Sequence, residues 1–77
     1  MRISKEKDDP GYIEVGASYV CFLNNILMKD VVTADNMQGF VKVLLRDEDG
    51  KIMIDITAKK PFYKYLFGKV HIRKIEG

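Results

Sequence analysis

The sequence predicts an all-β fold, a small antiparallel barrel or two-layer sandwich of five to six short strands joined by hairpins. Three observations support this prediction: apolar residues alternate with polar ones in short runs, turn-forming residues separate these runs, and the whole chain has only 77 residues. A chain this short buries only about 60 % of the surface that its unfolded state exposes. Closure of the sheet is therefore favoured, because no helix is expected to protect the strand edges.

The chain begins with a charged segment and continues as one domain. Residues 1–11 contain the run KEKDDPG and are predicted to form a flexible N-terminal tail. Residues 12–77 are predicted to form a single β domain, with structure starting near Tyr12. The chain contains 47 % apolar and 31 % charged residues, which is typical of a folded domain rather than a disordered one.

The first hairpin is predicted around Asn24 and Asn25. These residues tolerate a positive φ and lie between two apolar runs, residues 19–23 and 26–28, as in a tight hairpin. A helix over residues 17–28 is the competing interpretation, but the two asparagines in its middle disfavour it. Val31 and Val32 extend the second strand.

Residues 33–39 are polar and end in glycine, so they are expected to form a loop or a single helical turn capped by Thr33 or Asp35. A second hairpin is predicted to follow, with strands FVKVLLR and KIMIDI on either side of an acidic turn at residues 47–50. Its aliphatic residues alternate, so one face of this hairpin is expected to be the centre of the core. The predicted buried residues are Val41, Val43, Leu45, Ile52, Ile54, Ile56, Val70 and Ile72.

The C-terminal segment FYKYLFGKVHIRK is predicted to form a strand pair or one bent strand. Gly68 interrupts this segment at the point where a bulge or a sharp bend is expected. Alternation places Tyr63, Tyr65 and Phe67 on one face of the strand.

Catalytic chemistry is disfavoured by the residue types present, and the sequence predicts a protein that is not an enzyme and has no cofactor. Cys21 and His71 are the only cysteine and histidine, so one chain cannot supply the four ligands of a structural zinc site. Cys21 lies in an apolar run and is interpreted as a core residue, while His71 is expected to face solvent, which disfavours a Cys–His pair. The acidic turn does not have the spacing of a calcium loop.

No membrane span and no signal peptide are expected, because the longest uncharged run is too short and the N-terminus has mixed charges. The predicted location is therefore cytoplasmic.

Protein assembly is the favoured function, because several large apolar residues are out of phase with the best core face. A self-associating homo-oligomer or a protein partner would bury them and would also stabilise a small domain. The predicted interface residues are Phe22, Met28, Met37, Phe40 and Leu44.

Binding of single-stranded nucleic acid is the alternative function. Residues 59–77 contain six Lys or Arg and one acidic residue, whereas residues 1–58 contain seven Lys or Arg and ten Asp or Glu. Aromatic residues that stack on bases and lysines that contact phosphates are the usual components of such a surface. The candidate contacts are Lys59, Lys60, Lys64, Tyr65, Lys69, His71 and Arg73.

Residues 24–72 resemble small β-proteins encoded by bacteriophages. The resemblance rests on the Asn-Asn hairpin, on VVTAD leading through Gly39 into a strand, on the DGK turn and on GKV near the end. It implies a phage accessory or virion-associated protein, located in the bacterial host cell or in the virion. It also allows a third function, inhibition of a host protein, but it implies no catalytic residue.

Overall fold

The computed structural model describes residues 1–12 and 18–75, which form nine short strands and no helix. The prediction of an all-β fold with antiparallel sheets is therefore confirmed at that level. The strands are β1 (Arg2–Ser4), β2 (Tyr19–Leu23), β3 (Ile26–Leu27), β4 (Val31–Asp35), β5 (Phe40–Leu44), β6 (Ile54–Asp55), β7 (Lys60–Pro61), β8 (Tyr63–Phe67) and β9 (Val70–Lys74).

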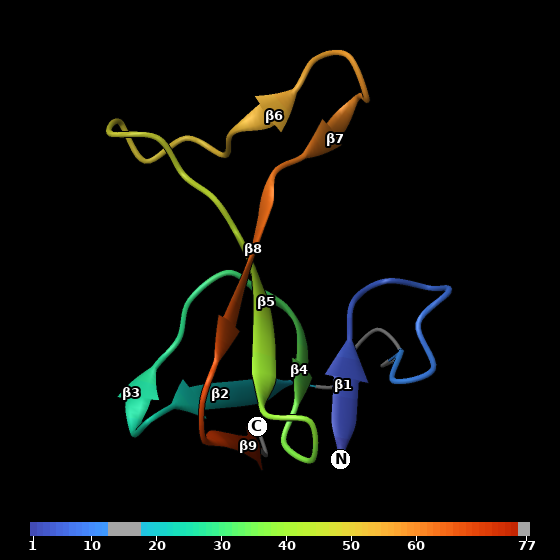
Figure 1. Ribbon diagram of the computed structural model, residues 1–77, viewed down its shortest axis with the longest axis vertical. Coiled ribbons are helices and arrows are strands. Elements are labelled where there is room, and N and C mark those ends of the chain that lie inside the picture. Colours follow the sequence, from blue (N-terminus) through green and yellow to red (C-terminus); the bar gives the residue numbers. More distant parts are fainter. Residues whose placement is uncertain (13–17, 76–77) are drawn as a thin grey trace.

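The strands form three antiparallel sheets that do not close into a barrel. A four-stranded sheet has the order β1-β4-β5-β8, a three-stranded sheet has the order β3-β2-β9, and β6 pairs with β7. Strand β2 of the three-stranded sheet runs across the strands of the four-stranded sheet in Figure 1, whereas β6 and β7 lie apart from both. The chain therefore has a body of two sheets and a separate projection.

The hydrophobic core draws its residues from the two larger sheets. Its buried members come from both of them, and Val41 and Ala34 at its centre are fully buried. The buried apolar residues of this cluster are Ile3, Cys21, Ala34, Val41, Val43 and Val70. The sequence thus correctly predicts the burial of Val41, Val43 and Val70, while Leu45 and Ile72 are half-buried.

The Asn-Asn hairpin predicted from the sequence is confirmed. Asn24 and Asn25 have φ values of 51° and 67°, the left-handed pair that a two-residue type I′ turn requires. Leu23 pairs with Ile26 across this turn, so residues 19–27 form a hairpin and not a helix.

The bend predicted at Gly68 is also confirmed, and it carries the chain from one sheet to the other. Strand β8 ends just before Gly68 and β9 begins just after it. The amide of Gly68 donates to the carbonyl of Gly39 at 3.0 Å, and the side chain of Asn24 accepts a hydrogen bond from the amide of Lys69 at 2.9 Å. A Cβ at Gly68 would lie 2.8 Å from the Asn24 side chain, so the corner has no room for a larger residue.

Two segments expected to be irregular are strands in the structure. Strand β1 lies within residues 1–11, pairs with β4 and buries Ile3, so regular structure begins at Arg2 and not near Tyr12. Strand β4 extends to Asp35, which makes the prediction of a loop over residues 33–39 wrong for its first three residues. Strands β1 and β4 pair with each other across about 30 residues of sequence, so the local sequence of either segment does not predict the pairing.

The second predicted hairpin differs most from expectation. Residues 47–50 do form a turn, in which the amide of Gly50 donates to the carbonyl of Asp47 at 3.0 Å. The two predicted strands meet next to this turn, through a bridge between Arg46 and Ile52 and a hydrogen bond from the amide of Met53 to the carbonyl of Leu45. However, β5 itself pairs with β4 and β8. Ile52, Ile54 and Ile56, predicted to be core residues, are all exposed. The strand that was expected to complete the core lies outside it.

Candidate protein interface

Residues 45–62 form a projection that we call the arm. In Figure 1 it leaves the body at the ends of β5 and β8 and carries β6 and β7 at its far end. At its base three chain segments lie side by side: the amide of Met53 donates to the carbonyl of Leu45 at 2.9 Å, and the amide of Phe62 donates to the carbonyl of Met53 at 3.0 Å. The arm is thus held by backbone hydrogen bonds and contributes no member of the core cluster.

The arm exposes apolar side chains that are typical of a core. The side chain of Ile54 is 59 % exposed and that of Ile56 is 86 % exposed. A two-stranded ribbon is marginally stable on its own in water, and adjoining exposed aliphatic residues usually mark an interaction site. The exposed apolar residues of the arm are Ile52, Met53, Ile54, Ile56 and Phe62.

Both turns of the arm are capped by an aspartate. One carboxylate oxygen of Asp47 accepts hydrogen bonds from the amides of Asp49 and Lys51, each at 2.9 Å. One carboxylate oxygen of Asp55 accepts from the amides of Thr57 and Ala58 at 3.1 and 3.2 Å. These local contacts favour the conformations of both turns.

An ion pair joins the arm to the body. The guanidinium group of Arg46 donates to both carboxylate oxygens of Asp30, at 2.7 and 2.9 Å, and also to the carbonyl of Gly50 at 2.7 Å. The hydrogen bond from Arg46 lowers the pKa of Asp30 below its usual value. This fork-shaped contact fixes direction as well as distance, so it orients the arm relative to the body.

A second surface lies on the outer face of the four-stranded sheet, where Tyr65 and Phe67 are exposed and Phe40 is buried. Phe40 and Lys42 of β5 lie beside aromatic residues of β8, with the Phe40 ring centroid 5.9 Å from that of Tyr65 and 6.4 Å from that of Phe67. The ammonium group of Lys42 is 4.2 Å from the ring centroid of Tyr63. We call Phe40, Tyr63, Tyr65 and Phe67 the aromatic face.

The cations beside the aromatic face are paired with acids. Arg2 donates to both oxygens of Asp9, at 2.9 and 2.7 Å, and lies 3.4 Å from Asp35. Lys42 donates to Glu6 at 2.8 Å. The hydrogen bond from Arg2 lowers the pKa of Asp9 to about 2. Two cations thus meet three carboxylates here, so the face has no excess of positive charge.

The residues predicted as a protein interface are not brought together. Phe40 and Leu44 share the outer face of β5, as expected, but Phe40 is covered by Arg2 and by its aromatic neighbours. Met28 packs against the core cluster, and Met37 is 87 % exposed at the turn between β4 and β5. Phe22 lies on the three-stranded sheet with its ring centroid 6.1 Å from that of His71.

The residues considered for nucleic-acid contact lie in three places. Lys59 and Lys60 are in the arm, and Lys69 is at the corner between the two larger sheets. Tyr65 belongs to the aromatic face, whereas Lys64 is its neighbour on β8 and points to the opposite side of the sheet. His71 and Arg73 alternate with the core-facing Val70 and Ile72 of β9.

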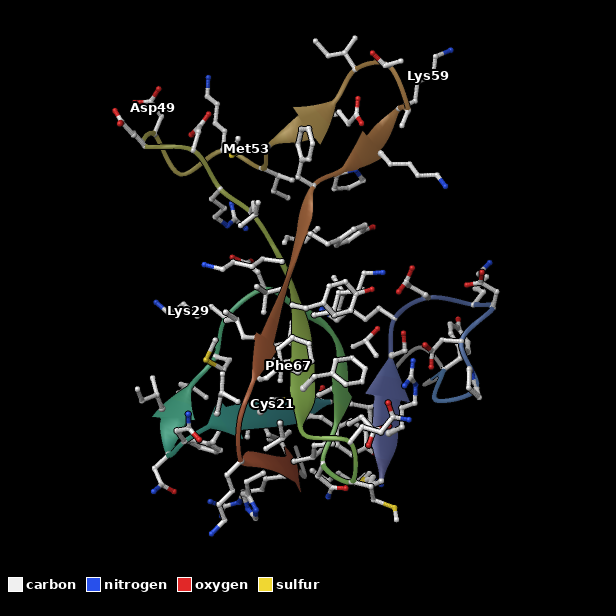
Figure 2. All side chains as sticks on the ribbon, viewed as in Figure 1. Cys21, Lys29, Asp49, Met53, Lys59 and Phe67 are labelled. Atoms are coloured by element: carbon white, nitrogen blue, oxygen red, sulfur yellow. The ribbon has the colours of Figure 1, made fainter. Side chains whose placement is uncertain are left out.

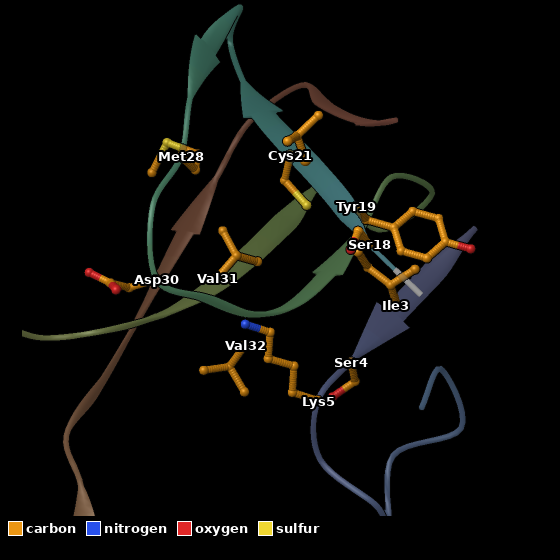
Figure 3. Close-up of a pocket in the computed structure, with 11 residues that line it drawn as sticks. Ile3, Ser4, Lys5, Ser18, Tyr19, Cys21, Met28, Asp30, Val31 and Val32 are labelled. Carbon is orange, nitrogen blue, oxygen red and sulfur yellow. The ribbon is translucent and has the colours of Figure 1, made fainter. Parts of the chain in front are cut away.

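Cys21 and His71 point to opposite faces of the three-stranded sheet. Cys21 pairs with Ile72 in the core, whereas His71 pairs with Phe22 on the other face. Burial raises the pKa of the Cys21 thiol. Figure 3 shows Cys21 among the residues that line a hollow in the body. The hollow has a volume of about 290 Å³ and is also lined by Asp30, which is paired with Arg46.

In the described part of the chain, no three histidine, cysteine or acidic side chains gather as a metal ion would require. Among residues 1–12 and 18–75 no helix has the length and apolar character needed to cross a lipid bilayer.

Comparisons of the chain with protein-family models, with curated proteins and with solved structures returned no match. The assignment of function therefore rests on the surfaces described above.

The arm is the feature that sequence reasoning missed. The alternation of Ile52, Ile54 and Ile56 in the sequence predicts an apolar strand face, but it does not show that this face lies outside the core of the chain. One signal was available: the segment lies between two charged turns of its own, the acidic residues 47–49 and the basic residues 59–60.

Proposed function

We propose that this protein is a non-enzymatic assembly module that binds other protein chains, including copies of itself, through the arm. The observation that carries the proposal is the exposure of Ile54 and Ile56, which have the spacing and chemistry of core residues but lie outside the core. In a chain of 77 residues, burial of these side chains by a partner would add substantially to a thin margin of stability.

In this proposal the body serves as a rigid base for the arm. Its two larger sheets would act as the layers of a small sandwich, which is supported by the contribution of both sheets to one core cluster. The pairing of Arg46 with Asp30 would then present the arm in one orientation.

Nucleic-acid binding receives less support from the charge distribution. The aromatic face is the best stacking platform in the described residues, but Arg2 and Lys42 beside it are bound to carboxylates. A phosphate backbone would have to displace those carboxylates, and affinity for nucleic acid depends mainly on available cations. The proposed relation to bacteriophages rests on the sequence resemblance alone.

A concentration series tests the proposed function. We expect sedimentation analysis of the wild type to show reversible association as concentration rises, and a variant with Ile54→Asn and Ile56→Asn to remain monomeric. Met37→Asn is the matched control, because Met37 is also a highly exposed apolar residue but lies on the body. Association that survives the arm variant and is lost in Met37→Asn would refute the role of the arm and favour the interface predicted from the sequence.

A further inference from the structure

The arm carries opposite charges at its two ends. The turn at residues 47–50 contains Asp47, Glu48 and Asp49, and the turn between β6 and β7 leads through Lys59 to Lys60. Figure 2 shows Asp49 and Lys59 at opposite ends of the arm, with Met53 between them. The arm is therefore an apolar stretch with an acidic turn at one end and a basic turn at the other.

Neighbouring charges do not cancel this polarity. Lys51 follows the acidic turn, but three carboxylates precede it. Arg46 also donates to the carbonyl of Gly50 in this turn, but its charge is paired with Asp30 of the body. Asp55 precedes the basic turn, but two lysines, Lys59 and Lys60, follow it. The side chains of Asp49 and Lys59 make no hydrogen bond or ion pair with the described residues, so both are available to a partner.

This pattern is complementary to itself. If two arms lie antiparallel, related by a twofold axis, the acidic turn of each chain meets the basic turn of the other and the apolar stretches face each other. A parallel arrangement would place like charges together. Closed twofold interfaces use the same patch on both chains, so one sequence supplies both halves of the complementarity.

We propose that the arm of one chain docks antiparallel on the arm of a second copy, with each acidic turn against the partner's basic turn. This proposal rests on the proposed function and names its partner. The apolar contact supplies most of the affinity, and the charged turns select the antiparallel orientation. An acidic or basic protein of different sequence would match only one end of the arm.

Reversing one charge at a time tests the orientation. We expect Asp49→Lys alone and Lys59→Glu alone each to weaken self-association by about tenfold, because each homodimer then contains two contacts between like charges. An equimolar mixture of the two variants should associate with about the wild-type affinity, because the mixed dimer restores opposite charges at both ends. The chain carrying both substitutions should also regain that affinity.

Sedimentation equilibrium measures the dissociation constant of each variant, and circular dichroism checks that each variant keeps its β structure. The neutral variants Asp49→Asn and Lys59→Gln should also lower the affinity of self-association, but by less. They keep the test valid if a reversed charge disturbs the conformation of a turn. Two single reversals that associate as tightly as the wild type, or a mixture no tighter than its components, would overturn the antiparallel pairing. The proposed function would still hold in that case if the wild type associates and the variant with Ile54→Asn and Ile56→Asn does not. A wild type that is monomeric at all concentrations would overturn both.

Discussion

Arg46 holds Asp30 through two hydrogen bonds, one to each carboxylate oxygen, at 2.7 and 2.9 Å, and its remaining terminal nitrogen donates to the carbonyl of Gly50 at 2.7 Å. One side chain thereby contacts both the body, just before β4, and the acidic turn of the arm. Asp30 has a φ of 59°, and its carbonyl accepts a hydrogen bond from the amide of Leu44 at 3.0 Å, so its position is also set by the backbone. The Arg46–Asp30 pair therefore holds the arm in one orientation relative to the four-stranded sheet.

Removal of this link should loosen the arm and leave the body intact. We expect Arg46→Gln to increase the rate of amide hydrogen exchange at Met53 and Phe62, whose hydrogen bonds hold the base of the arm, and not at Val41 in the core. Lys51→Gln is the control, because its ammonium group makes no hydrogen bond or ion pair with the described residues. Unchanged exchange at Met53 in Arg46→Gln would show that the ion pair does not restrain the arm.

The core and the arm should respond differently to truncation. Val41→Ala removes a fully buried side chain and should lower the free energy of unfolding by about 2 to 3 kcal/mol. Ile56→Ala removes a side chain that is 86 % exposed and should change it by less than about 0.5 kcal/mol, measured by urea unfolding under monomeric conditions. A large decrease in the free energy of unfolding for Ile56→Ala would mean that Ile56 is buried within a single chain, as the alternation in the sequence predicts.

The two asparagines of the first hairpin should not be equivalent. Both have a positive φ, so replacement by alanine costs a similar backbone energy at each position. Only the Asn24 side chain accepts a hydrogen bond from the amide of Lys69 across the corner at Gly68. We therefore expect thermal unfolding to show that Asn24→Ala is about 1 kcal/mol more destabilising than Asn25→Ala. Equal losses would exclude a stabilising role for that contact.

Acid should weaken the fold through the Arg2–Asp9 pair. The pKa of Asp9 is lowered to about 2 by the hydrogen bond from Arg2, so the unfolded chain takes up this proton at a higher pH than the folded one. The resulting stability is fully present above about pH 4 and is lost as the pH falls towards 2. Asp9→Asn should reduce the drop in unfolding free energy between pH 5 and pH 2, and Asp30 and Asp35, whose pKa values are also lowered, should account for part of the remaining drop.

Asp8→Asn is the matched control for this titration, because the carboxylate of Asp8 is exposed and makes no hydrogen bond or ion pair with the described residues. An equal effect of the Asp8 and Asp9 substitutions on the pH dependence would contradict the assignment to the ion pair.

The features that the sequence predicted correctly are those with local causes. The Asn24–Asn25 turn follows from the tolerance of asparagine for positive φ, and the bend at Gly68 follows from a glycine that interrupts an otherwise alternating segment. The alternation of Val41 and Val43 correctly predicted which face of β5 is buried. Each of these conclusions needs only a few neighbouring residues.

The features that were missed depend on contacts distant in the sequence. Strand β1 forms in a charged segment because Ile3 reaches the core and Arg2 pairs with Asp35, 33 residues away. The alternation of Ile52, Ile54 and Ile56 shows that one face of a strand is apolar but does not identify what covers it. Local sequence cannot distinguish coverage by the same chain from coverage by a second one.

Methyl NMR spectra recorded over a dilution series test the central claim most directly, because they observe single side chains. If the arm associates with a second chain, the methyl signals of Ile54 and Ile56 should shift with protein concentration, whereas those of Val41 and Val70 in the core should not. Methyl signals of Ile54 and Ile56 that do not change with concentration, or changes of equal size in the arm and the core, would contradict it.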